Sequence, residues 1–493
     1  MMDNLKSRVV RSGAWVFGMR FVHQVFYLGR LIILARLLAP KDFGLMGIAL
    51  LTMMTLETFS QTGFQEALIQ KKKNTEEYLD SAWTVLVIRG IILFSIIVLI
   101  APLVARFFET PQAKGVVQAI GLAILIQAFT NVGVVYFQKE LEFNKQFIYI
   151  TAGTVTDFAV AVTAAILMRS VWALLFGLVA GKLAQLIVSY IIHPYKPKIS
   201  MDFHKSGELF GFGKWILGST ILVFLITQGD DLLVGKILGV TMLGFYQMAY
   251  KISNTPATEI TKLLSQVTLP AFSKLQDDFI KLKDAYLRVL KFTSFLTFPL
   301  TGLIFALSPE FTRIFLGDKW MPMVPAMQVL VLAGLIRAII STTGPLFYSV
   351  GKPRIDTKCQ VIRFVVLAWC IYPLIVKSGL TGASLAVVFS VLISGVFFAF
   401  YAVKVLSLSS RAFLKELVIP LVNTIVFVSF IFGIKSVILI KFWALILVGM
   451  GALILYLFMA YVSDKVFDYN IYINIKENLK LLLPDVKKAG TGS

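Results

Sequence analysis

Fourteen stretches of about 20 mostly apolar residues constrain this 493-residue chain more than any other feature. A helix needs about 20 such residues to cross the hydrocarbon core of a bilayer. The chain is 58% hydrophobic and 15% charged, whereas a soluble domain is about 25% charged. We therefore predict an all-α integral membrane protein with 14 transmembrane helices, at residues 10–35, 44–69, 82–107, 115–138, 146–168, 170–192, 213–236, 242–270, 289–307, 324–349, 359–377, 381–403, 413–434 and 442–462.

The distribution of Lys and Arg predicts the orientation of these helices. With the N-terminus inside, the inner loops and tails hold 29 of the 47 basic residues, the outer loops hold 11, and seven fall within the spans. Basic residues gather in cytoplasmic loops, so we expect both termini to be cytoplasmic and the protein to lie in the cell inner (cytoplasmic) membrane. The net charge of +20 then lies at membrane edges, where it meets anionic lipid, and does not indicate nucleic-acid binding.

A short phrase occurs twice, 200 positions apart, at residues 35–44 and 235–244. The informative matches are a base, Arg36 or Lys236, and a glycine, Gly44 or Gly244. Each copy ends the first helix of a set of six. Six is even, so both sets start on the same side, which predicts a parallel repeat. We expect two six-helix lobes facing a central space, with the chain divided into an N-lobe (1–192), an interfacial linker (193–212), a C-lobe (213–405), a last pair of helices (406–463) and a cytoplasmic tail (464–493).

Polar residues recur at helical spacing inside the expected spans. A charged side chain at the bilayer centre costs about 2.5 kcal/mol or more, so such residues normally face protein, water or a ligand. The richest stripes lie on spans one, two, seven and eight, which predicts that these helices line the central space. Two related halves and membrane-buried charges are typical of a transporter. Bases outnumber acids on these stripes, which favours an anionic cargo. The alternative is that bases and acids simply pair between helices, as Lys262 could with Glu259.

Three buried acids form a separate group of candidates. Asp230 and Asp231 lie on span seven, and Glu57 lies on span two. Asp230 occupies the repeat position of Arg30, so an Arg30–Asp230 gate is one interpretation. Coupling to Na⁺ or H⁺ through these acids is the other.

No enzyme signature occurs in the sequence. A phosphate-binding Walker loop, HExxH, CxxC and GxSxG are all absent. We therefore expect no catalytic residues, no metal site and no cofactor other than a coupling ion. The energy for transport would come from a gradient or from later consumption of the cargo.

Three segments resemble a known family. They are residues 36–44, residues 137–143 and residues 229–239. They look like the polysaccharide transporter family of the multidrug, oligosaccharidyl-lipid and polysaccharide exporter superfamily, and most like its Wzx-type flippases of the colanic acid and teichuronic acid exporter kind. The resemblance implies a V-shaped, two-lobed bundle. It also implies alternating-access movement of undecaprenyl-pyrophosphate-linked oligosaccharide from the cytoplasmic to the outer leaflet, for surface polysaccharide export. Partners would be the lipid-linked cargo, membrane lipids, a polysaccharide polymerase and other assembly proteins.

Under this interpretation the polar stripes divide into two roles. The bases would bind the diphosphate: Arg20, Arg30, Arg89, Lys251, Lys262 and Arg337. Hydrogen-bonding and aromatic residues would bind sugar: Tyr27, Gln61, Gln65, Asn254 and Tyr348. The competing hypothesis is an ion-coupled multidrug antiporter of the same superfamily, in which acidic residues should dominate the cavity. A third alternative is a membrane-embedded glycosyltransferase or polymerase. It would need a catalytic acid or large outer loops, which are missing from the sequence.

Overall fold

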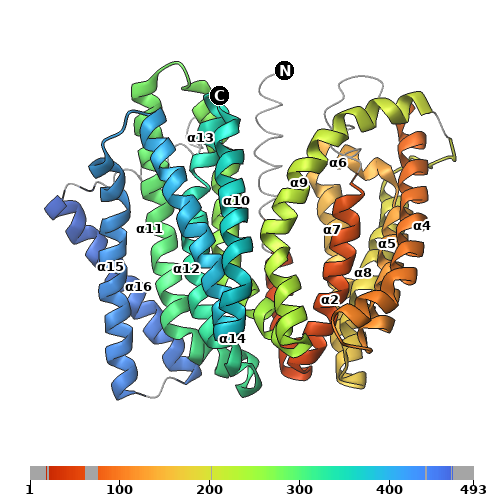
Figure 1. The fold of residues 1–493 in the computed structure, drawn as a ribbon, viewed down its shortest axis with the longest axis horizontal. Coiled ribbons are helices and arrows are strands. Elements are labelled where there is room, and N and C mark those ends of the chain that lie inside the picture. Colours follow the sequence, from red (N-terminus) through yellow and green to blue (C-terminus); the bar gives the residue numbers. More distant parts are fainter. Residues whose placement is uncertain are drawn as a thin grey trace, which may run out of the picture. The chain divides into compact units, whose positions relative to one another are not determined.

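The computed structural model describes residues 18, 22–61, 76–140, 142–200, 203–438, 441–467 and 469. The described secondary structure is entirely helical (Figure 1). Residues 22–37 form the first described helix. It is followed by α2 (Pro40–Phe59), α4 (Glu76–Phe107), α5 (Ala113–Ala128), η1 (Val132–Val134), α6 (Val135–Lys139), α7 (Phe143–Met168), α8 (Val171–Ile192), α9 (Phe203–Leu238), α10 (Val240–Lys274), α11 (Phe279–Phe311), η2 (Thr312–Leu316), η3 (Asp318–Met323), α12 (Val324–Ile340), α13 (Thr343–Ser349), α14 (Pro353–Val405), α15 (Ser410–Val437) and α16 (Phe442–Phe467).

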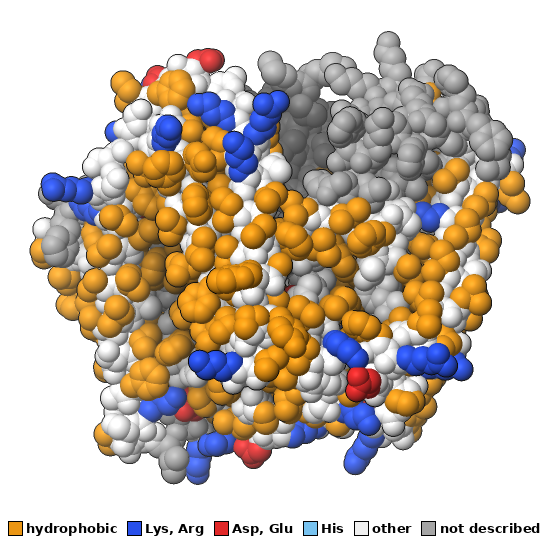
Figure 2. Space-filling model, viewed as in Figure 1, with side chains coloured by type: hydrophobic (Ala, Val, Ile, Leu, Met, Phe, Trp, Pro, Cys, Tyr) orange, Lys and Arg blue, Asp and Glu red, His pale blue; other side chains and the backbone are white. Residues whose placement is uncertain are grey.

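The described helices cover most of the expected spans. By length and composition, nine of the described helices are apolar and long enough to cross a membrane. The chain is therefore an all-helical, multi-pass membrane protein. On the face shown in Figure 2, hydrophobic side chains cover the middle of the helices, and most Lys and Arg side chains lie toward their ends. This distribution suits a bilayer, whose core excludes charge.

Two expected boundaries have a clear backbone cause. Arg169 adopts a left-handed conformation, with φ of 45°, and ends α7 two residues before α8 begins. The expected spans 359–377 and 381–403 are both contained in α14, which breaks at Gly379, with φ of 56° and ψ of −133°. Positive φ is open to glycine at little cost.

The fourth expected span, 115–138, differs from the structure. There α5 ends at Ala128, and the chain continues as the short helices η1 and α6. The side chain of Asn131 stabilises the new conformation: its amide oxygen accepts a hydrogen bond from the Gly133 amide at 2.9 Å, which caps η1. Its amide nitrogen donates to the Tyr195 carbonyl at 2.6 Å. Hydropathy alone does not predict a helix end that depends on the hydrogen bonds of one polar side chain.

The chain divides into two compact units. The first contains residues 1–247 together with Phe315–Lys319, and the second contains residues 248–314 and 320–493. This division places α9 and the first turns of α10 with the first unit. It follows contacts, whereas the boundaries expected from the sequence follow the repeat.

Within the first unit, the two copies of the repeated phrase meet. A Cβ atom on Gly44 of α2 would lie 1.8 Å from the carbonyl oxygen of Val240, at the start of α10. Conversely, a Cβ atom on Gly244 of α10 would lie 2.0 Å from the carbonyl oxygen of Pro40, at the start of α2. The two helix beginnings thus approach until only glycine fits at both positions.

Other residues around the first phrase hold it in place. Both carboxylate oxygens of Asp42 accept backbone hydrogen bonds, from Ala39 at 2.9 Å and from Val171 at 3.0 Å. One carboxylate thereby caps the N-termini of both α2 and α8. The Lys319 ammonium donates to the carbonyls of Arg36 and Leu38, at 2.8 and 2.7 Å. A cation is favoured there because these carbonyls end the helix at residues 22–37.

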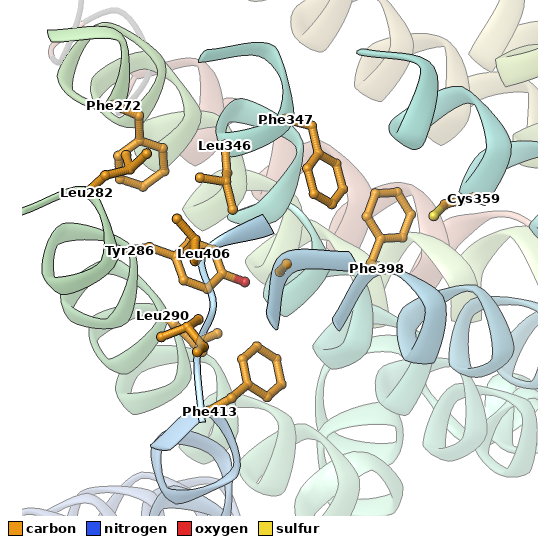
Figure 3. Packing of buried hydrophobic residues seen from close by; sticks show 12 residues of the cluster. Phe272, Leu282, Tyr286, Leu290, Leu346, Phe347, Cys359, Phe398, Leu406 and Phe413 are labelled. Carbon is orange, nitrogen blue, oxygen red and sulfur yellow. The ribbon is translucent and has the colours of Figure 1, made fainter. Parts of the chain in front are cut away.

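The second unit has an apolar core where α10, α11, α13 and α14 pack together. Figure 3 shows the large side chains of this core, including Phe272, Tyr286, Phe347 and Phe398. The Tyr286 hydroxyl is hydrogen-bonded to Thr343 at 2.9 Å, so its polar atom is satisfied inside the core. Near the other end of α11, the α15 residue Lys435 pairs with Glu310 at 2.8 Å.

Candidate functional site

A cavity of about 150 Å³, lined by both apolar and polar side chains, lies in the first unit, between residues 22–37, α7 and α8. His23, Tyr27 and Arg30 line one side of it. Their spacing of four and three puts them on one helical face, as the stripe on span one predicts. The rings of His23 and Tyr27 are stacked, with centroids 6.3 Å apart.

Close packing of α7 against α8 forms the opposite side. A Cβ atom on Gly181 would lie 2.8 Å from the Gly153 carbonyl oxygen, and one on Gly177 would lie 2.6 Å from the Asp157 carboxylate. The glycines therefore let Asp157 lie between the two helices. From there its Oδ2 atom forms an ion pair with the Arg30 Nε atom at 3.1 Å. Arg30, a predicted diphosphate ligand, thus has a carboxylate partner.

Lys182 also lines this cavity, together with Thr154 and Gln185. It is half-buried and forms no hydrogen bond or ion pair with a residue that the structure describes. An unneutralised ammonium inside a membrane is costly, by about 2.5 kcal/mol or more. The sequence analysis left Lys182 out of the predicted ligands. The sequence did carry a signal for Lys182: it lies three residues before Gln185, so the two polar side chains share one face of a mostly apolar helix.

Arg89 of α4, another predicted diphosphate ligand, caps the end of α2. Its Nε atom donates to the Ser60 carbonyl at 2.9 Å, and its Nη2 atom donates to the Glu57 carbonyl at 3.0 Å. The Glu57 carboxylate in turn attracts both Arg89 and Lys182. Gln61 follows directly after this helix end. Arg20 and Gln65, which were predicted to bind diphosphate and sugar, lie outside the described residues.

The paired acids of α9 are held by two residues of α10. The Tyr246 hydroxyl donates to Asp230 at 2.8 Å, and the Gln247 amide donates to Asp231 at 2.9 Å. Asp230 is 2% exposed, so its carboxylate is removed from solvent. In this conformation Arg30 pairs with Asp157, and an Arg30–Asp230 gate stays a prediction.

The second unit has a cationic group of its own, Arg337, where α12 meets α10. The Arg337 guanidinium donates to the Asn254 amide oxygen at 2.7 Å and to the Tyr250 hydroxyl. It also lies over the Tyr250 ring, 5.1 Å from the centroid. These partners are neutral, so the hydrogen bonds orient Arg337 without neutralising its charge. Lys251 lies next to Tyr250 on α10.

Two predicted ligands of the second unit are more peripheral. Lys262 is exposed and pairs with Glu259 at 3.0 Å, which confirms the pairing that the sequence offered as an alternative. Tyr348 is 52% exposed, and its hydroxyl donates to Asp356 at 3.2 Å. The structure thus brings Arg337, Asn254 and Tyr250 together, while Lys262 and Tyr348 make separate contacts. Across the described residues, no group of three or more His, Cys, Asp or Glu could hold a metal ion.

The fold defines a class of protein. The structure superposes on the lipid II flippase MurJ in its inward closed conformation with a TM-score of 0.75, at 16% identity, covering 92% of this chain and 99% of that one. At this identity the likeness establishes the fold alone: the chain has the all-helical, multi-pass architecture of that protein.

The sequence comparisons then give the family. Residues 33–325 match the family model described as polysaccharide biosynthesis protein, and the chain belongs to this family. It is 23% identical to an uncharacterized membrane protein in the cps region of Klebsiella pneumoniae, over 86% of this chain and 88% of that protein. It is 24% identical to the lipopolysaccharide biosynthesis protein WzxC of Escherichia coli, over 85% of each. The predicted resemblance is confirmed, and the family places the chain among membrane transporters rather than enzymes.

Proposed function

We propose that this protein is a flippase that moves polyprenyl-pyrophosphate-linked oligosaccharide repeat units from the cytoplasmic to the outer leaflet of the inner membrane. The family and the transporter fold support this function. The observation that carries it is the Arg337 guanidinium inside an apolar helix, whose described hydrogen-bond partners are neutral.

The cargo needs such groups. A diphosphate and several sugars cannot cross about 30 Å of hydrocarbon unaided, whereas a polyprenyl tail is stable in lipid. A guanidinium can bind phosphate oxygens through two parallel hydrogen bonds. Arg337 is already oriented by Tyr250 and Asn254, so little side-chain entropy would be lost on binding. We assign the diphosphate to Arg337 and Lys251 in the second unit.

The remaining features of the proposal follow the sequence. Fourteen transmembrane helices in two lobes would alternate access to a V-shaped central cavity, with both termini cytoplasmic. Asp230 and Asp231 are the candidates for coupling to Na⁺ or H⁺. Tyr246 and Gln247 hold the two carboxylates in place, which suits either an ion ligand or a gate.

The test is a flipping assay in proteoliposomes that contain lipid-linked oligosaccharide. An impermeant reagent that modifies only glycan on the outer surface reports translocation. We expect the R337Q and K251Q variants to lower the initial rate at least tenfold, because each removes a charge that binds the diphosphate. The matched control is K281Q, which removes an exposed lysine paired with Asp278 at 2.8 Å.

Two results would contradict the proposal. Wild-type rates in the double variant R337Q/K251Q would exclude the cationic diphosphate site. Absence of flipping by the wild-type protein, together with gradient-driven export of cationic drugs, would support the antiporter instead.

A further inference from the structure

We propose that the cavity between residues 22–37, α7 and α8 is a subsite for one acidic sugar of the cargo, whose carboxylate binds the Lys182 ammonium. This inference rests on the proposed function and names the class of glycan: a repeat unit that contains a uronic acid or another sugar with a single carboxylate.

The size of the cavity suits one sugar ring. Its volume is about 150 Å³, and an engineered protein cavity of that volume accommodates the six-membered ring of benzene. Here the lining combines apolar surface with polar side chains such as Thr154, Lys182 and Gln185, so a hydroxylated ring is the fitting occupant.

The lining offers each kind of contact that a sugar uses. Tyr27 and His23 present aromatic rings, against which the C–H face of a pyranose can stack. Thr154 and Gln185, on the facing helices, offer a hydroxyl and an amide for sugar hydroxyls. Sites of this kind combine apolar surface with a few placed polar groups.

The charges favour a single carboxylate over a diphosphate. Arg30 is neutralised by Asp157 at 3.1 Å. Of the remaining groups, Arg89 and Lys182 are positive, and Glu57, which attracts both, is negative. The charges of these five described groups sum to +1, and of the two bases Arg89 and Lys182 only Lys182 lines the cavity. A monoanion would balance it, whereas a diphosphate would bring excess negative charge beside Asp157 and Glu57.

The subsite is also preformed. The contacts of Gly153, Gly177 and Gly181 leave no room for α7 and α8 to approach further. Lys182 directly follows Gly181, so its backbone is fixed by that contact. A rigid wall lowers the entropic cost of binding.

The experiment measures binding to the full-length protein in lipid nanodiscs. D-glucuronate, D-glucose and inorganic pyrophosphate are titrated separately, with saturation-transfer NMR as the readout. We expect glucuronate to bind at least tenfold more tightly than glucose. The K182Q variant should lose that difference, and K182R should restore most of it. The K281Q variant serves as the control for a distant lysine. Because K182Q removes an unpaired charge, it should fold at least as well as the wild type, which its thermal midpoint checks.

The outcomes separate the subsite from the proposed function. Equal binding of glucose and glucuronate, or an unchanged preference in K182Q, would overturn the subsite. Pyrophosphate binding that depends on Lys182 and displaces glucuronate would also overturn it and assign the cavity to the diphosphate. If the wild type binds glucuronate through Lys182 but flips no lipid-linked glycan, the proposed function fails and the sugar-acid site stands. If it flips acidic and neutral glycans equally well, with and without Lys182, the function stands and the subsite fails.

Discussion

Replacing Gly44 with Ala tests whether the repeated phrase is a packing element. The new Cβ atom would lie 1.8 Å from the Val240 carbonyl oxygen, whereas ordinary contact begins at 3.4 Å. The backbones of α2 and α10 would have to separate by the difference, about 1.6 Å. The obstacle is backbone, not the end of a flexible side chain, so a rotamer change cannot relieve it.

The magnitude follows from two opposing terms. Overpacking costs about 1–3 kcal/mol, and a rigid obstacle puts this site at the upper end. Exchanging glycine for alanine inside a helix returns about 1 kcal/mol. The net loss is then about 2 kcal/mol of the free energy of unfolding. At about 2–4 °C per kcal/mol for a unit of this size, the thermal midpoint should fall by about 4–8 °C.

The assay is thermal unfolding of detergent-solubilised protein, with the folded fraction at each temperature measured by size-exclusion chromatography. The matched control is G229A in α9, where no neighbouring atom lies within 4 Å of the new Cβ atom. We expect its midpoint to stay the same or rise. Equal midpoints for G44A and G229A would refute the claim that the two copies of the phrase are held together by glycine contact.

Three further predictions concern polar contacts of the first unit. K319M removes two hydrogen bonds to helix-terminal carbonyls, at 2.8 and 2.7 Å, and should speed hydrogen exchange of residues 315–319 at least tenfold; unchanged exchange would contradict the contact. D42A removes two backbone caps and should cost about 2 kcal/mol, which a thermal midpoint equal to that of the wild type would disprove. Burial, followed by the nearby lysine charge, lowers the pKa of His193. Its ring accepts a hydrogen bond from the Tyr195 amide at 3.2 Å, so this contribution is present above about pH 6.5 and is lost as the pH falls below it. H193Q should flatten the pH dependence of the midpoint between pH 7 and 5, and a slope that persists in the variant would assign it to another group.

The positions of the helices could be predicted because a helix that crosses the hydrocarbon core needs a run of about 20 mostly apolar residues. The break at Gly379 and the stop at Arg169 coincide with gaps between expected spans, since polar or flexible residues interrupt the apolar run there. The early end of α5 was not predicted, because Asn131 acts through partners that are distant in sequence, Ser189 and Tyr195.

For the candidate site, the sequence could predict only which polar residues share one face of a helix. Spacing placed His23, Tyr27 and Arg30 on one side of a helix, and the cavity contains all three. Spacing could not show that Asp157 neutralises Arg30 or that Lys182 stays unpaired, because both depend on how α7 rotates against α8. It also suggested Arg89 as a ligand, whereas the fold uses its guanidinium to cap α2.

The sequence by itself determined that this protein lies in a membrane, that it is all-helical and to which family it belongs. Those properties depend on composition, on runs of apolar residues and on short motifs, and each is local in the chain. The tertiary structure decided which of the buried charges are neutralised and which remain available to a ligand. That choice is made by contacts between helices, where glycines set the approach to within a fraction of an ångström and a partner's distance fixes the strength of each ion pair.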